Sequence, residues 1–272
     1  MLGVFDSGVG GLSVVRHLLR ALPEAGVVYV ADTAHVPYGP RSLAEVRAFS
    51  HAITRYLLDL GAAEIVVACN TASAAALKSL RESFPGVPFV GMEPAVKPAA
   101  EQTHSGVVGV LATPATFQGE LFASVVERFA RDVRVLRQTC PGLVEQIEAG
   151  RLDTPDTEAL LRVWLEPMLQ EGIDALVLGC THYPFVIPLL ERICGPDVRV
   201  IDPAPSVARQ AARLWQGSPA GTGVTYGTTG DVPDFDRFRR QVGLPDGPTV
   251  NLIWQDGRLL AGGGFTQISQ LG

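Results

Sequence analysis

The sequence predicts an α/β fold of two pseudo-symmetric domains, each a mostly parallel sheet flanked by helices, with a candidate active site in the cleft between them. Short β-branched runs alternate with helical stretches along the chain, which is the pattern of parallel strands joined by helices. The chain also contains an internal resemblance between two pairs of segments. GVFDSGVGG at 3–11 resembles VGVLATPAT at 108–116, and IVVACNTAS at 65–73 resembles LVLGCTHYP at 176–184.

The internal resemblance indicates two copies of one α/β unit. Cys69 and Cys180 occupy matched positions 111 residues apart, and Ser7 and Thr113 are 106 residues apart. Two similar offsets in one chain are typical of a duplicated unit.

The domain boundaries follow from this duplication. We expect residues 1–94 together with about 208–272 to form the first domain, and residues 95–207 to form the second. The glycine-rich end from Gly262 is expected to be poorly ordered.

Each expected element has a local signal. The β-branched runs predict strands at 2–5, 27–31, 64–69, 87–91, 107–111, 133–137, 174–179 and 198–201, with weaker signals at 224–227 and 250–254. Ser42 and Glu45 form a capping-box pattern at the start of one helix. Thr113-Pro114 and Thr154-Pro155 place an N-cap before a proline, which predicts two more helix starts.

Composition excludes several classes of protein. With 272 residues, 47% hydrophobic and 18% charged, the chain can bury a large core. The net charge of −6, without a basic stripe, argues against nucleic acid as a partner. No signal peptide or membrane-spanning run is present, so we expect a cytoplasmic protein without a membrane partner.

The four cysteines predict free thiols. No CxxC pair and no ligand-spaced histidine accompanies them, so neither a metal site nor a disulfide framework is expected. Cys69 and Cys180 end two predicted strands, and in parallel sheets the carboxyl ends of strands form the ligand crevice. Helices that begin near Thr71 and Thr181 would aim free N–H groups into this crevice, favour anions and lower the thiol pKa. The expected ligand is therefore a small carboxylate.

Six motifs carry a family resemblance. They are FDSGVGGLSV at 5–14, YVADTAHVPYG at 29–39, VACNTASA at 67–74, GMEPAVKPA at 91–99, GVLATPAT at 109–116 and LGCTHYPF at 178–185. In this set and order the chain resembles the glutamate racemases of the cofactor-independent aspartate/glutamate racemase superfamily. The resemblance implies interconversion of L- and D-glutamate by proton transfer at Cα, without pyridoxal phosphate, another cofactor or a metal. It further implies a homodimer that supplies D-glutamate for peptidoglycan.

The resemblance also implies roles for particular residues. Cys69 and Cys180 match the two bases of the family, one for each face of Cα. Asp6 would assist Cys69, while His182 and Glu148 would assist Cys180. The positions that match the substrate-binding residues are Asp6, Ser7, Pro37, Tyr38, Gly39, Asn70, Thr71, Thr113, Thr181 and His182.

Other interpretations of the sequence stay open. The cysteines could be packing residues, and the small polar residues could be helix caps. The reaction could be that of an aspartate or hydantoin racemase, or a hydrolysis with one nucleophilic cysteine and His182 as its base. A protein that binds glutamate without catalysis is a further alternative. A nucleotide-binding loop is disfavoured, because DSGVGG lacks the G-x-G-x-x-G spacing.

Overall fold

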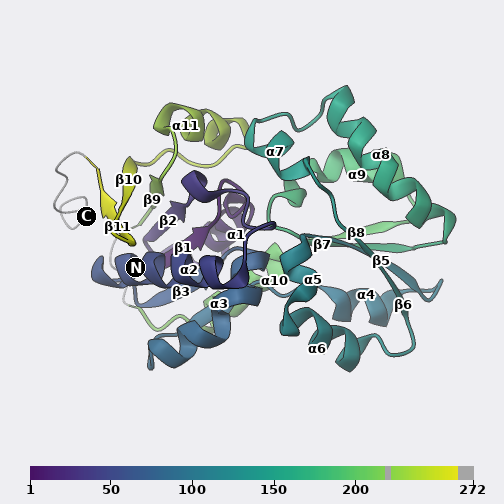
Figure 1. The fold of residues 1–272 in the computed structure, drawn as a ribbon, viewed down its shortest axis with the longest axis horizontal. Helices are drawn as coiled ribbons and strands as arrows, with labels where there is room; N and C mark the ends of the chain where they lie inside the picture. The colour runs from purple at the N-terminus through teal and green to yellow at the C-terminus, as the bar shows by residue number, and fades with distance from the viewer. Residues whose placement is uncertain (218–221, 263–272) are drawn as a thin grey trace.

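A computed structural model describes residues 1–217 and 222–262, and it confirms an α/β fold of mostly parallel sheets flanked by helices. Figure 1 shows the two sheets side by side, with the N-terminal sheet on the left. The glycine-rich end was predicted to be poorly ordered from Gly262. Gly262 is described, and its N donates to Asn251 O at 2.8 Å, whereas residues 263–272 lie outside the described part of the chain.

The N-terminal sheet has seven strands in the order β11-β10-β9-β2-β1-β3-β4. Their bounds are β1 Leu2–Asp6, β2 Val27–Ala31, β3 Glu64–Val67, β4 Phe89–Gly91, β9 Val224–Thr228, β10 Thr249–Gln255 and β11 Arg258–Ala261. Neighbouring strands are parallel except β10 and β11, which form an antiparallel hairpin at the edge. The sequence signals did not predict β11.

The second sheet repeats the centre of the first. Its strands are β5 Val107–Ala112, β6 Arg134–Gln138, β7 Ala175–Gly179 and β8 Arg199–Ile201, in the order β6-β5-β7-β8. The first four strands of the chain lie in the equivalent order, β2-β1-β3-β4. In the first unit, β1 therefore pairs with β3, the strand that precedes Cys69. In the second unit, β5 pairs with β7, the strand that precedes Cys180. This common order supports the predicted duplication.

Helices cover both faces of each sheet. They are α1 Leu12–Ala21, α2 Leu43–Asp59, α3 Asn70–Ser83, α4 Val96–Gln102, α5 Pro114–Gln118, α6 Glu120–Phe129, α7 Leu143–Glu148, α8 Pro155–Gln170, α9 Ile187–Cys194, α10 Ala204–Leu214 and α11 Val232–Gln241. Ser42 forms the predicted capping box with Glu45 at the start of α2. Thr113 and Thr154 cap α5 and α8, each with proline at the first helical positions.

The alternation of side chains along β1 shows how the core is divided. Leu2 and Val4 pack into a cluster with α1, α10 and α11, whereas Phe5 packs with α2 and α3 on the opposite face. The first of these clusters continues into the second sheet, where it includes Leu176 and Leu178 of β7. The two units therefore share a continuous apolar core.

The helix α10 lies between the two units of the fold. It begins at Ala204 and packs against α1, so the predicted boundary near residue 208 falls inside a helix. The strands β9, β10 and β11 extend the N-terminal sheet. The division of the chain into domains at residues 94 and 208 stays a prediction.

The predicted helix beginning near Thr181 is absent from this described segment. A 3-10 turn, η2 Tyr183–Val186, follows Cys180, and α9 begins only at Ile187. Pro184 has no N–H to donate to the carbonyl of Cys180, and Tyr183 N donates to this carbonyl instead, at 3.2 Å. Of the two helices expected to begin directly after a cysteine, only the one after Cys69 is present: α3 begins at Asn70.

Candidate active site

A single small cavity collects residues from the carboxyl ends of strands in both sheets. Its volume is about 20 Å³. Its lining consists of Ser7, Pro37, Tyr38, Gly39, Cys69, Asn70, Thr71, Thr113, Val144, Cys180, Thr181 and His182. Both predicted base positions and every predicted substrate-binding residue except Asp6 are in this set. The parallel strands explain this convergence, because their carboxyl ends lie at one edge of each sheet.

Cys69 is delivered to the cavity by β3 and caps the next helix. Its backbone is extended, and its Sγ accepts a hydrogen bond from Ala72 N at 3.4 Å. The side chain is 4% exposed. Burial, and then the nearby Asp6, raise the pKa of this thiol well above its ordinary value. The prediction that a helix N-terminus lowers this pKa is therefore wrong for Cys69: the hydrogen bond from Ala72 acts in that direction but is outweighed.

Asp6 lies beneath the cavity at the end of β1 and is fully buried. Its Oδ2 accepts hydrogen bonds from Gly11 N at 2.6 Å and Thr181 Oγ1 at 3.2 Å, and its Oδ1 accepts from Ser7 Oγ at 3.4 Å. Burial raises the pKa of Asp6, although the charge of His182 opposes this shift. A carboxyl group from the first sheet therefore contacts the residue that follows Cys180.

Cys180 faces a chain of two further polar groups. Its Sγ lies 3.8 Å from His182 Nδ1, and His182 Nε2 lies 2.6 Å from Glu148 Oε1. Burial by itself lowers the pKa of His182, but the contacts with Cys180 and Glu148 outweigh it and hold this pKa well above the ordinary value. Val9 N donates to the same Glu148 oxygen at 2.8 Å. A histidine whose pKa is raised therefore lies directly beside the sulfur of Cys180.

Glycines in the DSGVGG loop allow this packing. A Cβ on Gly8 would overlap the carboxylate of Glu148, and a Cβ on Gly10 would overlap the ring of His182. These glycines therefore allow the first unit to approach the second closely.

Asn70 and Thr71 add polar groups at the first turn of α3. Asn70 is buried, and within the described part of the chain neither its amide nitrogen nor its amide oxygen has a hydrogen-bond partner. Thr71 Oγ1 lies 2.8 Å from Thr113 Oγ1, so hydroxyl groups from the two sheets meet at the cavity. An unpartnered buried amide is costly unless a ligand satisfies it.

Some residues of the site were not predicted. Val144 of α7 lines the cavity one helical turn before Glu148, and nothing in its apolar sequence context indicated this place. Ser13 Oγ donates to the carbonyl of Thr181 at 2.9 Å and so holds the turn after Cys180 from α1. Its position in FDSGVGGLSV was the only available signal.

The described residues include no group of three or more His, Cys, Asp or Glu side chains arranged to hold a metal ion. Across the same residues, no helix combines the length and apolar character that crossing a membrane requires.

Comparisons with known proteins identify the family. The sequence model of the Asp/Glu/hydantoin racemase family matches residues 2–211. A curated glutamate racemase of Roseiflexus sp. (strain RS-1) is 50% identical over 251 residues, which cover 90% of this chain and 92% of that protein. The chain therefore belongs to the Asp/Glu/hydantoin racemase family. The Roseiflexus relative is a glutamate racemase, so the predictions of a resemblance to glutamate racemases and of an isomerase are confirmed.

Solved structures show the same fold. Escherichia coli glutamate racemase in complex with L-glutamate and the activator UDP-MurNAc-Ala has 32% identity and a TM-score of 0.81, with 93% of this chain and 98% of that chain covered. Glutamate racemase of Francisella tularensis in complex with D-glutamate has 27% identity and a TM-score of 0.79, covering 93% and 97%. The α/β architecture is therefore that of glutamate racemases.

Proposed function

We propose that this chain interconverts L- and D-glutamate by a two-base proton transfer at Cα. The observation that carries the proposal is the presence of two thiols, Cys69 and Cys180, from different sheets in one cavity. Inversion at a carbon requires a base on one face and an acid on the other. Two cysteines at opposed strand ends supply both roles if one begins as thiolate and the other as thiol.

The surroundings of the two thiols differ in a way that suits these roles. The imidazolium of His182, held by Glu148, stabilises a Cys180 thiolate. Cys69 is held as a thiol by burial and by Asp6. In one direction the Cys180 thiolate removes the α-proton from its face while the Cys69 thiol delivers its proton to the opposite face. The reverse reaction starts from the opposite protonation states, with Asp6 positioned to take the proton from Cys69.

Binding of the substrate carboxylates is assigned to the predicted polar residues. The N-terminus of α3 carries the positive end of the helix dipole, which favours an anion beside Asn70 and Thr71. The free amide of Asn70 can donate to a carboxylate and accept from an ammonium group. Hydrogen-bond donors aimed at the α-carboxylate also stabilise the carbanion that forms when the α-proton leaves.

The relatives support glutamate as the substrate. One related structure holds L-glutamate and another holds D-glutamate. Supply of D-glutamate for peptidoglycan, a cytoplasmic location and a homodimer rest on the family resemblance and stay predictions.

Deuterium incorporation tests the proposal. Incubation with L-glutamate in D₂O, without added cofactor, is expected to give D-glutamate with deuterium at Cα, and D-glutamate is expected to give deuterated L-glutamate. L-aspartate serves as the comparison substrate and is expected to react far more slowly. Folded protein that forms no product from either glutamate enantiomer would contradict the proposal. If aspartate were turned over faster than glutamate, the chain would be assigned as an aspartate racemase of the same family.

A further inference from the structure

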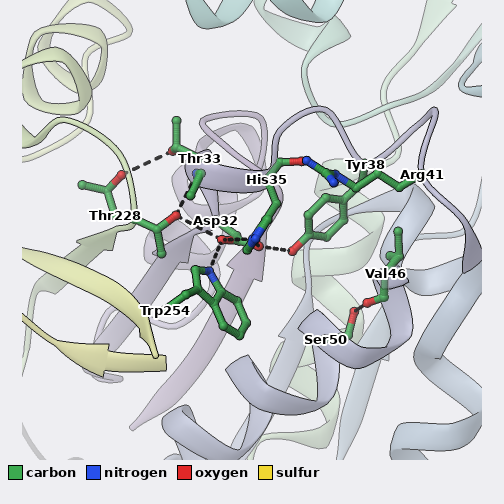
Figure 2. A network of polar contacts seen from close by, with 11 residues as sticks. Asp32, Thr33, His35, Tyr38, Arg41, Val46, Ser50, Thr228 and Trp254 are labelled. Atoms are coloured by element: carbon green, nitrogen blue, oxygen red, sulfur yellow. Dashed lines mark hydrogen bonds and ion pairs between the residues drawn. The ribbon is translucent and has the colours of Figure 1, made fainter. Parts of the chain in front are cut away.

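The buried carboxylate of Asp32 joins segments that are far apart in the sequence (Figure 2). Asp32 follows β2, and its Oδ1 accepts hydrogen bonds from Trp254 Nε1 of β10 at 2.7 Å and from Thr229 Oγ1 at 3.0 Å. Its Oδ2 accepts from Tyr38 OH at 2.6 Å. One carboxylate therefore links β10 and the residue after β9 to the turn that lines the cavity.

Aromatic rings fix the geometry of this network. His35 Nδ1 lies 2.9 Å from Asp32 Oδ2, and its ring stacks on Phe49 with a centroid distance of 4.0 Å. The ring centroid of Trp254 lies 5.1 Å from that of His35, in a T-shaped pair, and 5.6 Å from that of Phe49, in a tilted pair. The indole N–H is thus held toward Asp32 by packing as well as by the hydrogen bond.

The hydroxyl group of Tyr38 donates its hydrogen bond to Asp32. Burial, and then the neighbouring Asp32, raise the pKa of Tyr38 well above its ordinary value, so its hydroxyl stays protonated and donates. A phenol has one hydrogen, and here Asp32 receives it. The position of this side chain is therefore set by Asp32 and by what holds Asp32.

The wall formed by Tyr38 continues toward the second sheet. Pro37, Tyr38 and Gly39 all line the cavity. Gly39 packs closely on Thr113, because a Cβ added to this glycine would lie 3.0 Å from Thr113 Cβ. A shift of the phenol would consequently move a cavity wall and its contact with the other unit.

We propose that Asp32 and Trp254 are positioning residues of the substrate site, through which the edge hairpin of the N-terminal sheet fixes the turn at Tyr38 and Gly39. Trp254 lies beyond residues 2–211, which the family's sequence model matches. The proposal rests on the proposed function for its kinetic test, because that test follows turnover of glutamate. Neither residue touches the substrate; both act through Tyr38.

Kinetics of Trp254→Phe provide the first test. Phenylalanine keeps an aromatic ring but has no N–H, so Asp32 loses one donor. Loss of a hydrogen bond to a charged group is expected to raise KM for glutamate about tenfold, with kcat changed less than about threefold. Trp164→Phe, on α8, is the matched control and is expected to leave both constants unchanged.

A second pair of variants separates the hydrogen bond from packing. Thr229→Val keeps the size of the side chain but removes the hydroxyl, which donates to Asp32 and accepts from Ala34 N at 2.9 Å, and it is expected to raise KM. Thr229→Ser restores a hydroxyl and is expected to restore KM. Equal effects of valine and serine would contradict the role of this hydrogen bond.

A double-mutant cycle tests transmission through Tyr38. If Trp254 acts through Asp32 on the Tyr38 phenol, Trp254→Phe should have little further effect on KM in a Tyr38→Phe background. Additive effects would overturn the proposal, and so would an unchanged KM in a folded Trp254→Phe variant.

Nuclear magnetic resonance supplies a measurement independent of turnover. The indole N–H resonance of Trp254 is expected to shift in Tyr38→Phe, because the shared carboxylate loses a donor, while that of Trp164 stays in place. An unshifted Trp254 resonance would overturn the network. If the wild-type protein does not racemise glutamate, the proposed function fails, and this resonance still decides whether Trp254 and Tyr38 are coupled.

Discussion

Glu148 Oε1 lies 2.6 Å from His182 Nε2, and this contact joins the end of α7 to the turn that carries Cys180. The same histidine reaches the sulfur of Cys180 through its other ring nitrogen. The histidine that contacts Cys180 is therefore held by a carboxylate that does not itself line the cavity.

Glu148→Gln should lower the pKa of His182, because glutamine keeps a hydrogen-bond acceptor but loses the negative charge. The imidazole of His182 then loses its proton at a lower pH, and the decrease of kcat at high pH should begin at a correspondingly lower pH. We expect turnover in the direction that uses the Cys180 thiolate to fall about 100-fold. Titration of His182 by nuclear magnetic resonance and pH profiles of kcat measure both effects.

Glu145→Gln is the matched control, since Glu145 lies on the exposed side of the same helix. It should leave the His182 titration and the pH profile in place. An unchanged His182 titration in Glu148→Gln would show that the contact does not tune this histidine.

Cys69→Ser and Cys180→Ser should each reduce racemisation by about a thousandfold, because a hydroxyl is a far weaker acid than a thiol and does not ionise to a usable base near neutral pH. The remaining cysteine can still remove and return a proton on its own face. Each variant should therefore exchange the α-proton of one enantiomer in D₂O, and the two variants should prefer opposite enantiomers.

Cys194→Ser, in α9 and outside the cavity lining, should behave as wild type. Near-normal racemisation by either active-site variant would exclude the two-base mechanism. If only one of the two cysteines proved essential, a nucleophilic mechanism would be favoured instead.

Gly10→Ala should displace His182, because the added Cβ would overlap its ring and lie 2.7 Å from Asp6 Oδ2. A displacement of this size in a catalytic group is expected to lower kcat about 100-fold. Gly3→Ala, in β1, meets the end of the Ile65 side chain at 2.8 Å and should cost stability without lowering turnover per folded molecule. Thermal unfolding and kcat are measured for both variants. Equal decreases in kcat for Gly10→Ala and Gly3→Ala would contradict the predicted displacement of His182.

Glu64 should make stability fall as pH rises. This carboxyl is 1% exposed, has no hydrogen-bond partner among the described residues, and burial raises its pKa from 4.5 to about 7. The folded state holds the proton more tightly than the unfolded state, so stability is full below about pH 4.5 and decreases between this pH and about 7. Glu64→Gln removes that decrease.

Urea unfolding at pH 5 and pH 8 measures this effect. The free energy of unfolding of Glu64→Gln, relative to wild type, should increase by roughly 2 kcal/mol between the two pH values. Glu166→Gln, at an exposed position of α8, should show no such change. Parallel pH dependences of Glu64→Gln and wild type would contradict the assignment.

Local patterns predicted much of the fold. The capping box at Ser42 and the threonine caps at 113 and 154 act within one turn of chain, and the structure has all three. The prediction of a helix at Thr181 was wrong because prolines in the following segment favour a 3-10 turn. The prediction relied on the resemblance to residues 65–73, where a helix does follow the strand. The hairpin strand β11 was missed because an edge strand with polar and glycine neighbours carries a weak alternation signal.

The sequence by itself determined which side chains stand at the strand ends, because a β-branched run followed by small polar residues places them there whatever the rest of the chain does. Cys69 and Cys180 were therefore predictable as a matched pair. Only the tertiary structure decided how those strand ends meet. The place of Val144, the Asp32 link from Trp254 to Tyr38, and the raised pKa of Cys69 all depend on burial and contacts between distant segments. Such contacts depend on how the two units pack, and no local stretch of sequence encodes that packing.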